Sequence, residues 1–243
     1  MNDVIFMNGG PGFRTLTTVI LFLPLLAIVY KRKLWHYSFI AAVFCLTLTI
    51  FSSLFTSGRI KTSDDIIYII NILNSLVQPP LILMFLIYFS ENEQMRKSLR
   101  LTVIILLVTG ILILIRKDIQ DAAIPVIIGL GLLLVDIFSI YFFIQKIKES
   151  VTAKTETGKA FMVSGIVFSY FCYSFIFIAT YFFRSNNHED LFVLYEISTA
   201  ILALLIFAGI LLNKNKPGLK EKTDDKKTAG IPEWEGFAAS HRS

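Results

Sequence analysis

The sequence predicts an all-α, polytopic membrane protein, a bundle of seven transmembrane helices. Its 243 residues are 55% hydrophobic and only 17% charged, and the mean hydropathy of +0.67 is too apolar for an ordinary soluble domain. Apolar runs occupy most of the chain, each close to the roughly 20 residues that a helix needs to cross about 30 Å of hydrocarbon. Because lipid offers no hydrogen-bond partners to the backbone, runs of this length are expected to be helices.

Charged residues bound each predicted span. The chain has no basic residue before Arg14, at the start of the first span. This indicates a translocated amino terminus and no cleaved signal peptide. Basic clusters end the first, third, fifth and seventh spans, whereas Asp64, Asp121 and Asp190 precede the third, fifth and seventh. The predicted spans are 13–30, 36–56, 66–89, 99–115, 122–145, 160–183 and 191–212.

Basic residues alternate between the two sides of these spans. Because positively charged loops stay in the cytoplasm, the alternation predicts an outside amino terminus and a cytoplasmic carboxyl terminus in the cell membrane. The net charge of +5 is then explained by topology and by attraction to anionic lipid headgroups, and a nucleic-acid partner is not expected. The basic clusters are Lys31, Arg32 and Lys33; Arg96, Lys97 and Arg100; Lys146, Lys148, Lys154 and Lys159; and Lys214, Lys216, Lys220 and Lys222.

Residues 214–243 change character, because Pro217 and Gly218 end the last helix and alternating charges follow. We predict that this segment is a disordered cytoplasmic tail behind a transmembrane domain of residues 1–213. Its segment 231–237 is either a short docking peptide or a tail without a role. The expected partners are the lipid bilayer, a protein bound at the cytoplasmic loops or tail, and further copies of the chain in a homo-oligomer.

Polar side chains at membrane depth are the candidates for function, because each is costly without a partner or a water-filled cavity. The third span carries Asn71, Asn74 and Gln78 on one helix face, followed by Pro79 and Pro80, which are expected to kink the helix. These amides either wall a polar cavity or form interhelical hydrogen bonds worth about 0.6 kcal/mol each.

Two carboxyl groups are also predicted at membrane depth. Asp136 lies near the middle of the fifth span, and Glu196 lies inside the outer end of the seventh. Because no basic residue lies in mid-span to pair with them, each is expected to be protonated or to be wetted through a cavity. Asp136 is either a carrier of protons or cations or a neutral acid bonded to a neighbouring helix. Glu196 is either such a carrier or a residue in contact with outer-leaflet water.

The sixth span presents an aromatic face of Tyr170, Tyr173, Phe177 and Tyr181. Such a face either lines a pocket for a planar ligand or packs between helices. The candidate polar cavity predicted from the sequence therefore comprises seven residues: Asn71, Asn74, Gln78, Asp136, Glu196, Tyr170 and Tyr173.

The third span combines small polar residues with Pro80 and a leucine run, and the seventh places Ala200 four residues after the acid Glu196. With seven helices, short loops and an outside amino terminus, these patterns resemble the microbial rhodopsin family over about three of the seven spans. The resemblance places Asn74 where the family has its proton-accepting carboxylate.

The same resemblance places Tyr170, Tyr173 and Phe177 near the aromatic residues that line retinal. Ala200, however, stands where the family requires its Schiff-base lysine, and the seventh span contains no other lysine. The resemblance therefore implies a retinal-free relative that does not pump protons by photochemistry.

The chain carries no His-Glu-x-x-His pair and no Gly-x-Ser-x-Gly elbow, and its histidines, His36, His188 and His241, are widely dispersed. The sequence thus predicts no catalytic residues, no cofactor and no metal, although a small intramembrane enzyme is a third option. The favoured function is a non-enzymatic sensory or regulatory protein that acts through a separate partner. The alternative is a transporter of small solutes or ions, including a proton-coupled one.

The alternation of basic loops gives a direct prediction of topology. A cysteine introduced at residue 5 should react with an impermeant maleimide in intact cells, because the amino terminus is expected outside. A cysteine at residue 225 should react only after the cells are permeabilised. Reaction of residue 225 in intact cells would reverse the predicted orientation.

Overall fold

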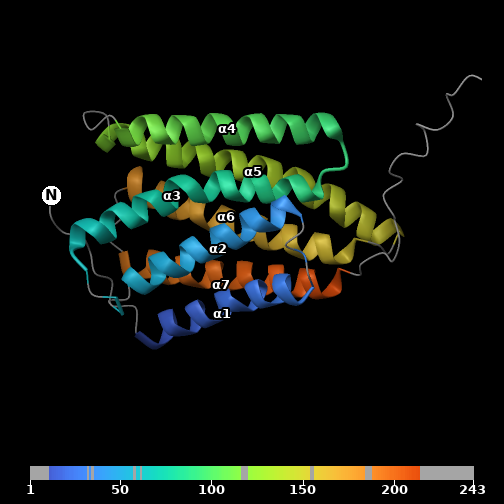
Figure 1. The fold of residues 1–243 in the computed structure, drawn as a ribbon, viewed down its shortest axis with the longest axis horizontal. Coiled ribbons are helices and arrows are strands. Elements are labelled where there is room, and N and C mark those ends of the chain that lie inside the picture. The colour runs from blue at the N-terminus through green and yellow to red at the C-terminus, as the bar shows by residue number, and fades with distance from the viewer. Residues whose placement is uncertain are drawn as a thin grey trace, which may run out of the picture. The chain divides into compact units, whose positions relative to one another are not determined.

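The computed structural model describes residues 11–31, 33, 36–56, 59–60, 62–115, 120–153, 156–183 and 188–213, and the predicted tail lies outside these residues. Within this part every regular element is a helix, and there are no strands (Figure 1). A short 3-10 helix, η2 (Ile87–Phe89), continues the third helix. The α-helices are α1 (Pro11–Tyr30), α2 (Tyr37–Thr56), α3 (Asp64–Leu86), α4 (Glu93–Ile115), α5 (Gln120–Ala153), α6 (Thr157–Tyr181) and α7 (His188–Leu212).

Two helices extend well beyond the predicted spans. The first turns of α4, from Glu93, are charged and include an ion pair of 3.2 Å between Glu93 and Lys97 one helical turn apart. Helix α5 is longer at its carboxyl end, where it continues to Ala153 instead of ending at residue 145 as predicted. Hydropathy locates the apolar part of a helix but not its polar ends.

Five of the described helices are long and apolar enough to cross a membrane: α2, α3 with η2, α5, α6 and α7. The described part of α1 is a shorter apolar helix, and the charged first turns of α4 leave it outside this group. Large apolar side chains such as Phe44, Ile104 and Leu133 are exposed on the outer surface of the helices. Together with five helices of spanning length, an apolar outer surface of this kind indicates contact with lipid, so the chain is a multi-pass membrane protein.

The helices pack in a closed order. Each helix packs against the next one along the chain, and α7 packs against α1; α3 also packs against α5. Figure 1 shows α1 beside α7 at one edge of the bundle and α4 beside α5 at the other. Because the chain reverses at each connection, α1, α3, α5 and α7 begin at the same end. We call this end the cavity end, and the opposite end the charged end.

The crossing of α6 and α7 depends on two glycines at the charged end. A Cβ atom at Gly158 would lie 2.5 Å from the carbonyl oxygen of Gly209 and 2.6 Å from the backbone nitrogen of Asn213. Since no real Cβ atom approaches backbone this closely, the two helices approach each other only because both positions lack side chains. Small residues permit such close contact between membrane helices, where dispersion forces hold the bundle together.

We therefore expect Gly158→Ala and Gly209→Ala to lower the free energy of unfolding in detergent by about 1–3 kcal/mol through overpacking. Gly110→Ala in α4 is the matched control, because a Cβ atom there meets nothing within 4 Å. That control should leave the stability unchanged or raise it by up to about 1 kcal/mol through helix propensity. Equal effects at all three positions would contradict the close crossing.

Candidate functional site

A cavity of about 320 Å³ lies between α1, α2, α3 and α7, towards the cavity end. Most of its lining residues carry a hydroxyl, amide or carboxyl group. We call it the polar cavity; it is lined by Thr17, Leu21, Thr49, Ser52, Ser53, Thr56, Asn71, Asn74, Ser75, Gln78, Phe192, Tyr195, Glu196 and Thr199.

Helix α2 contributes hydroxyl groups on one face, at Thr49, Ser52 and Thr56. The Thr49 hydroxyl donates to the carbonyl of Cys45 at 2.9 Å, and that of Thr56 donates to the carbonyl of Ser52 at 2.8 Å. Ser52 donates across the interface to Asn71 Oδ1 of α3 at 2.7 Å. The protons of these hydroxyls are therefore directed at protein acceptors, and their oxygen lone pairs are what α2 offers to the cavity.

Helix α3 contributes the predicted stripe of amides, Asn71, Asn74 and Gln78. Asn74 is 6% exposed, and its Oδ1 atom has no hydrogen-bond partner among the described residues. Helix α3 continues through Pro79 and Pro80, which lack the N–H groups that would normally bond the carbonyls of Ser75 and Leu76. The α3 side of the cavity is thus rich in acceptors.

Helix α7 contributes the acid. Glu196 is 4% exposed and shares the cavity lining with Tyr195 and Thr199. The hydroxyl of Thr199 donates to the carbonyl of Tyr195 at 2.7 Å, so the Tyr173 phenol of α6, 2.7 Å from the same hydroxyl oxygen, donates to it. This chain of bonds fixes the wall of the cavity that carries Glu196.

The aromatic residues of α6 belong to a neighbouring cavity. Tyr170 and Tyr173 line a space of about 190 Å³ that shares Ser75, Gln78 and Tyr195 with the polar cavity. The structure therefore places four of the predicted residues, Asn71, Asn74, Gln78 and Glu196, around one cavity, and the two tyrosines around the next.

Asp136 lies apart from these residues. It lines a groove of about 780 Å³ between α5 and α6, whose other lining residues are mostly apolar. Ser174 of α6 donates a hydrogen bond of 2.6 Å to its Oδ2 atom. No lining residue is common to this groove and the polar cavity. Asp136 and Glu196 are consequently placed for separate roles, and not for shared acid–base chemistry.

Below the polar cavity, towards the charged end, the buried side chains of the same helices become apolar. On α2 the change falls between Thr49 and Cys45, on α3 between Gln78 and Ile82, and on α7 between Thr199 and Leu202. We call this buried cluster the apolar layer; it includes Phe39, Ala42, Cys45, Ile82, Phe85, Leu86, Met162, Ile166, Leu202, Ile206 and Ile210.

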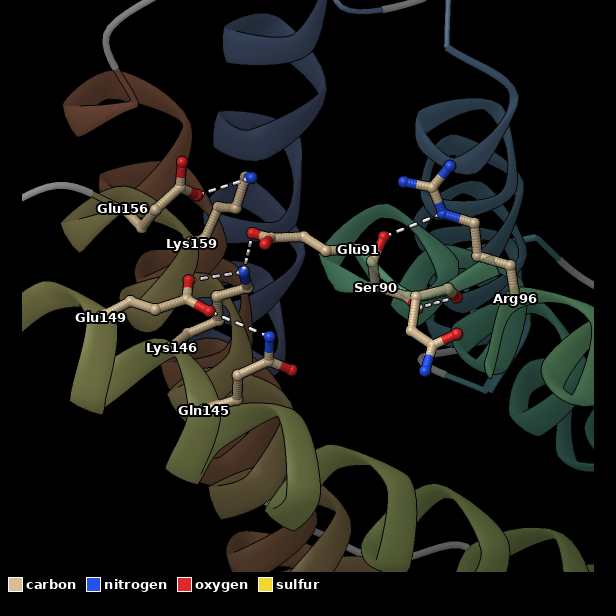
Figure 2. Close-up of polar contacts among 9 residues, drawn as sticks. Ser90, Glu91, Arg96, Gln145, Lys146, Glu149, Glu156 and Lys159 are labelled. Carbon is tan, nitrogen blue, oxygen red and sulfur yellow. Dashed lines mark hydrogen bonds and ion pairs between the residues drawn. The ribbon is translucent and has the colours of Figure 1, made fainter. Parts of the chain in front are cut away.

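A cluster of charged residues lies at the charged end, beyond the apolar layer. Figure 2 shows how these side chains meet. The side chain of Lys146 on α5 is 0% exposed, and its Nζ atom lies 2.8 Å from Glu91 Oε1 and 2.6 Å from Glu149 Oε2. Gln145 also donates to Glu149, at 2.9 Å, and Lys159 pairs with Glu156 at 2.6 Å. We call these residues the charged cluster. The buried ammonium of Lys146 therefore has two carboxylate partners, which compensate its positive charge.

Tyr88 connects the charged cluster to the carboxyl end of α7. Its ring lies under the ammonium of Lys159, at 5.3 Å, and its hydroxyl accepts a hydrogen bond of 2.8 Å from Asn213. The imidazole ring of His36 packs edge-to-face against the same tyrosine ring. Its Nδ1 atom accepts a hydrogen bond from the backbone N–H of Ser38. Burial, and then the positive charge of Arg96, lower the pKa of His36, which favours the neutral imidazole that this bond requires.

Sequence reasoning found the acid and the amides of the polar cavity but missed its hydroxyl groups. The signal was present, because Thr49, Ser52 and Thr56 follow helical spacing on one face of α2. The charged cluster was missed for a different reason. Lys146 belongs to a basic connection that the positive-inside rule already explains, and its partner Glu91 comes from a distant part of the chain.

We compared the chain with protein families, curated proteins and solved structures, and none of the three comparisons gives a match. Function must therefore be argued from the site itself.

The bond between Asp136 and Ser174 yields a prediction. Asp136→Asn retains an acceptor for the Ser174 hydroxyl, so the free energy of unfolding in detergent should change by about 1 kcal/mol or less. Ser174→Ala should lower it by a similar amount, and the double variant should show that the two effects are coupled. A much larger loss in Asp136→Asn would show that the fold needs the carboxyl group itself.

Proposed function

We propose that this chain is a seven-span sensory protein of the cell membrane, which binds a small polar ligand in the polar cavity from outside and acts through a separate protein at its cytoplasmic side. In this proposal α1 and α4 also cross the membrane, the cavity end faces outwards, and the charged end faces the cytoplasm. The basic connections at the charged end support this orientation.

The observation that carries the proposal is the position of the polar cavity in one half of the bundle, with the apolar layer between it and the charged cluster. The polar cavity is large enough for a small ligand, and the lower bound of typical ligand pockets is about 300 Å³. The apolar layer, with Phe85 and Leu86 fully buried, separates it from the charged cluster. A site that is closed towards one side suits the reception of a ligand better than its passage.

The resemblance to the microbial rhodopsin family is in keeping with this proposal. Asn74 and Glu196, which the resemblance places near the family's chromophore site, both line the polar cavity. With Ala200 in place of the lysine, the cavity would hold a diffusible ligand and no covalently bound retinal.

The second candidate function is transport, and the groove with Asp136 is the observation that favours it. A transporter exposes its central site alternately to both sides of the membrane. Residues of the apolar layer would then become accessible to water from the cytoplasm in one of its states, whereas in a sensor they stay dry.

Cysteine accessibility separates the two functions. In a background with Cys45→Ala and Cys172→Ala, Ser52→Cys places a thiol in the polar cavity, and Ala42→Cys places one in the apolar layer of the same helix. With an impermeant methanethiosulfonate, Ser52→Cys should react in intact cells. Ala42→Cys should react neither in intact cells nor in inside-out vesicles.

Reaction of Ala42→Cys from the cytoplasmic side would favour the transporter over the sensor. Reaction of Ser52→Cys only in inside-out vesicles would show that the polar cavity faces the cytoplasm, and the proposed orientation would be wrong.

A further inference from the structure

Resting on the proposed function, we infer that the polar cavity is a binding site for a small organic ammonium, a primary amine in its charged form, held between Glu196 of α7 and Asn74 of α3. Three features of the described lining carry this inference: its surplus of hydrogen-bond acceptors, its single acid, and the orphaned oxygen of Asn74.

The surplus of acceptors follows from the directions of the hydroxyl protons. Thr49 and Thr199 each donate to a carbonyl of their own helix, at 2.9 and 2.7 Å, and Ser52 donates to Asn71. A hydroxyl has one proton and two lone pairs, so Thr49 and Ser52 present acceptors to whatever occupies the cavity, and Thr199, which already accepts from Tyr173, retains one lone pair. An ammonium group provides three donors and no acceptor, which is the complementary pattern.

Asn74 supplies an independent sign that the cavity takes a ligand. A buried acceptor without a partner is costly, by about 1–3 kcal/mol. Its Oδ1 atom has no partner among the described residues, although the side chain is more than nine-tenths buried and lines the cavity. The carbonyl of Ser75, deprived of its usual donor by Pro79, lies on the same helix one residue further along.

The charges of the lining point to a cation. Glu196 is the only charged residue among the lining side chains that the structure describes, and no lysine or arginine is among them. Arg59 lies near the start of α1, where its guanidinium donates to Thr15, but it is exposed, so water and salt screen its charge. Glu196 is only 4% exposed, and a carboxylate forms its strongest hydrogen bonds with cationic donors such as an ammonium group.

The amide groups of Asn71, Asn74 and Gln78 also bring N–H donors to the lining. A ligand that has a hydroxyl beside its ammonium would use both kinds of group. Ethanolamine is such a probe, and it has two close analogues without the positive charge: ethylene glycol, which is neutral, and glycolate, which is an anion. The cavity of about 320 Å³ admits all three, so their comparison tests charge and not size.

The experiment measures how each probe slows the reaction of Ser52→Cys with a neutral, impermeant thiol reagent applied from outside. At ten times its dissociation constant ethanolamine should slow labelling by about tenfold, whereas ethylene glycol and glycolate should leave it unchanged. Glu196→Gln should abolish the protection, and Asn74→Leu should weaken it. Asp136→Asn is the matched control, since it removes a carboxyl group outside the polar cavity and should keep full protection.

Thermal unfolding of the unmodified protein in detergent gives a second measurement that is independent of the folding of any variant. Ethanolamine should raise the midpoint in a saturable manner, and neither analogue should do so. If Ser52→Cys reacts from outside but all three probes act alike, or protection survives Glu196→Gln, the ammonium site is wrong while the proposed function stands. If Ser52→Cys never reacts from outside, the proposed function fails and the ammonium site fails with it.

Discussion

The need to satisfy polar groups inside a lipid-embedded bundle is the constraint on which the arrangement of this protein depends. Lipid offers no hydrogen-bond partner, so each polar side chain must find one in the protein or in a cavity. Thr49, Thr199 and Ser52 meet this need by donating to neighbouring acceptors. Because their lone pairs then face one space, the residues that avoid the lipid also build a site.

Two helices, α3 and α7, connect the polar cavity to the charged cluster. α7 carries Glu196 near its beginning and Gly209 near its end, where the close crossing with α6 fixes its position. α3 carries Asn74 near its middle, and its continuation carries Tyr88 and then Glu91. A ligand that draws Asn74 and Glu196 together would act on both helices at once. α7 has no proline between Glu196 and Gly209, so a movement at Glu196 would be transmitted along this helix to the charged end.

The sequence was a good guide to the helices and to part of the site, for a physical reason. Hydrophobic length is a local property, so it located the apolar parts of α2, α3, α6 and α7 closely. Helical spacing is also local, which is why it grouped Asn71, Asn74 and Gln78 on one face. Which faces meet is decided by packing between distant segments. The sequence therefore could not show that Glu196 shares a cavity with these amides while Asp136 faces Ser174.

In the charged cluster Lys146 has two carboxylate partners, so one of the two ion pairs can break without leaving the buried ammonium unpaired. Lys146 is bound to Glu149 within α5 and to Glu91, which follows α3. The side chain of Glu91 is 64% exposed and that of Glu149 only 29% exposed. The ion pair between Lys146 and Glu91 is therefore the weaker of the two. Water screens the carboxylate of Glu91 more strongly than that of Glu149, although the ammonium that both of them bind is buried. A shift of α3 against α5 would thus separate Glu91 from Lys146 first, while Glu149 keeps the buried ammonium paired. Such a contact can respond to events at the other end of α3, because breaking it does not threaten the fold.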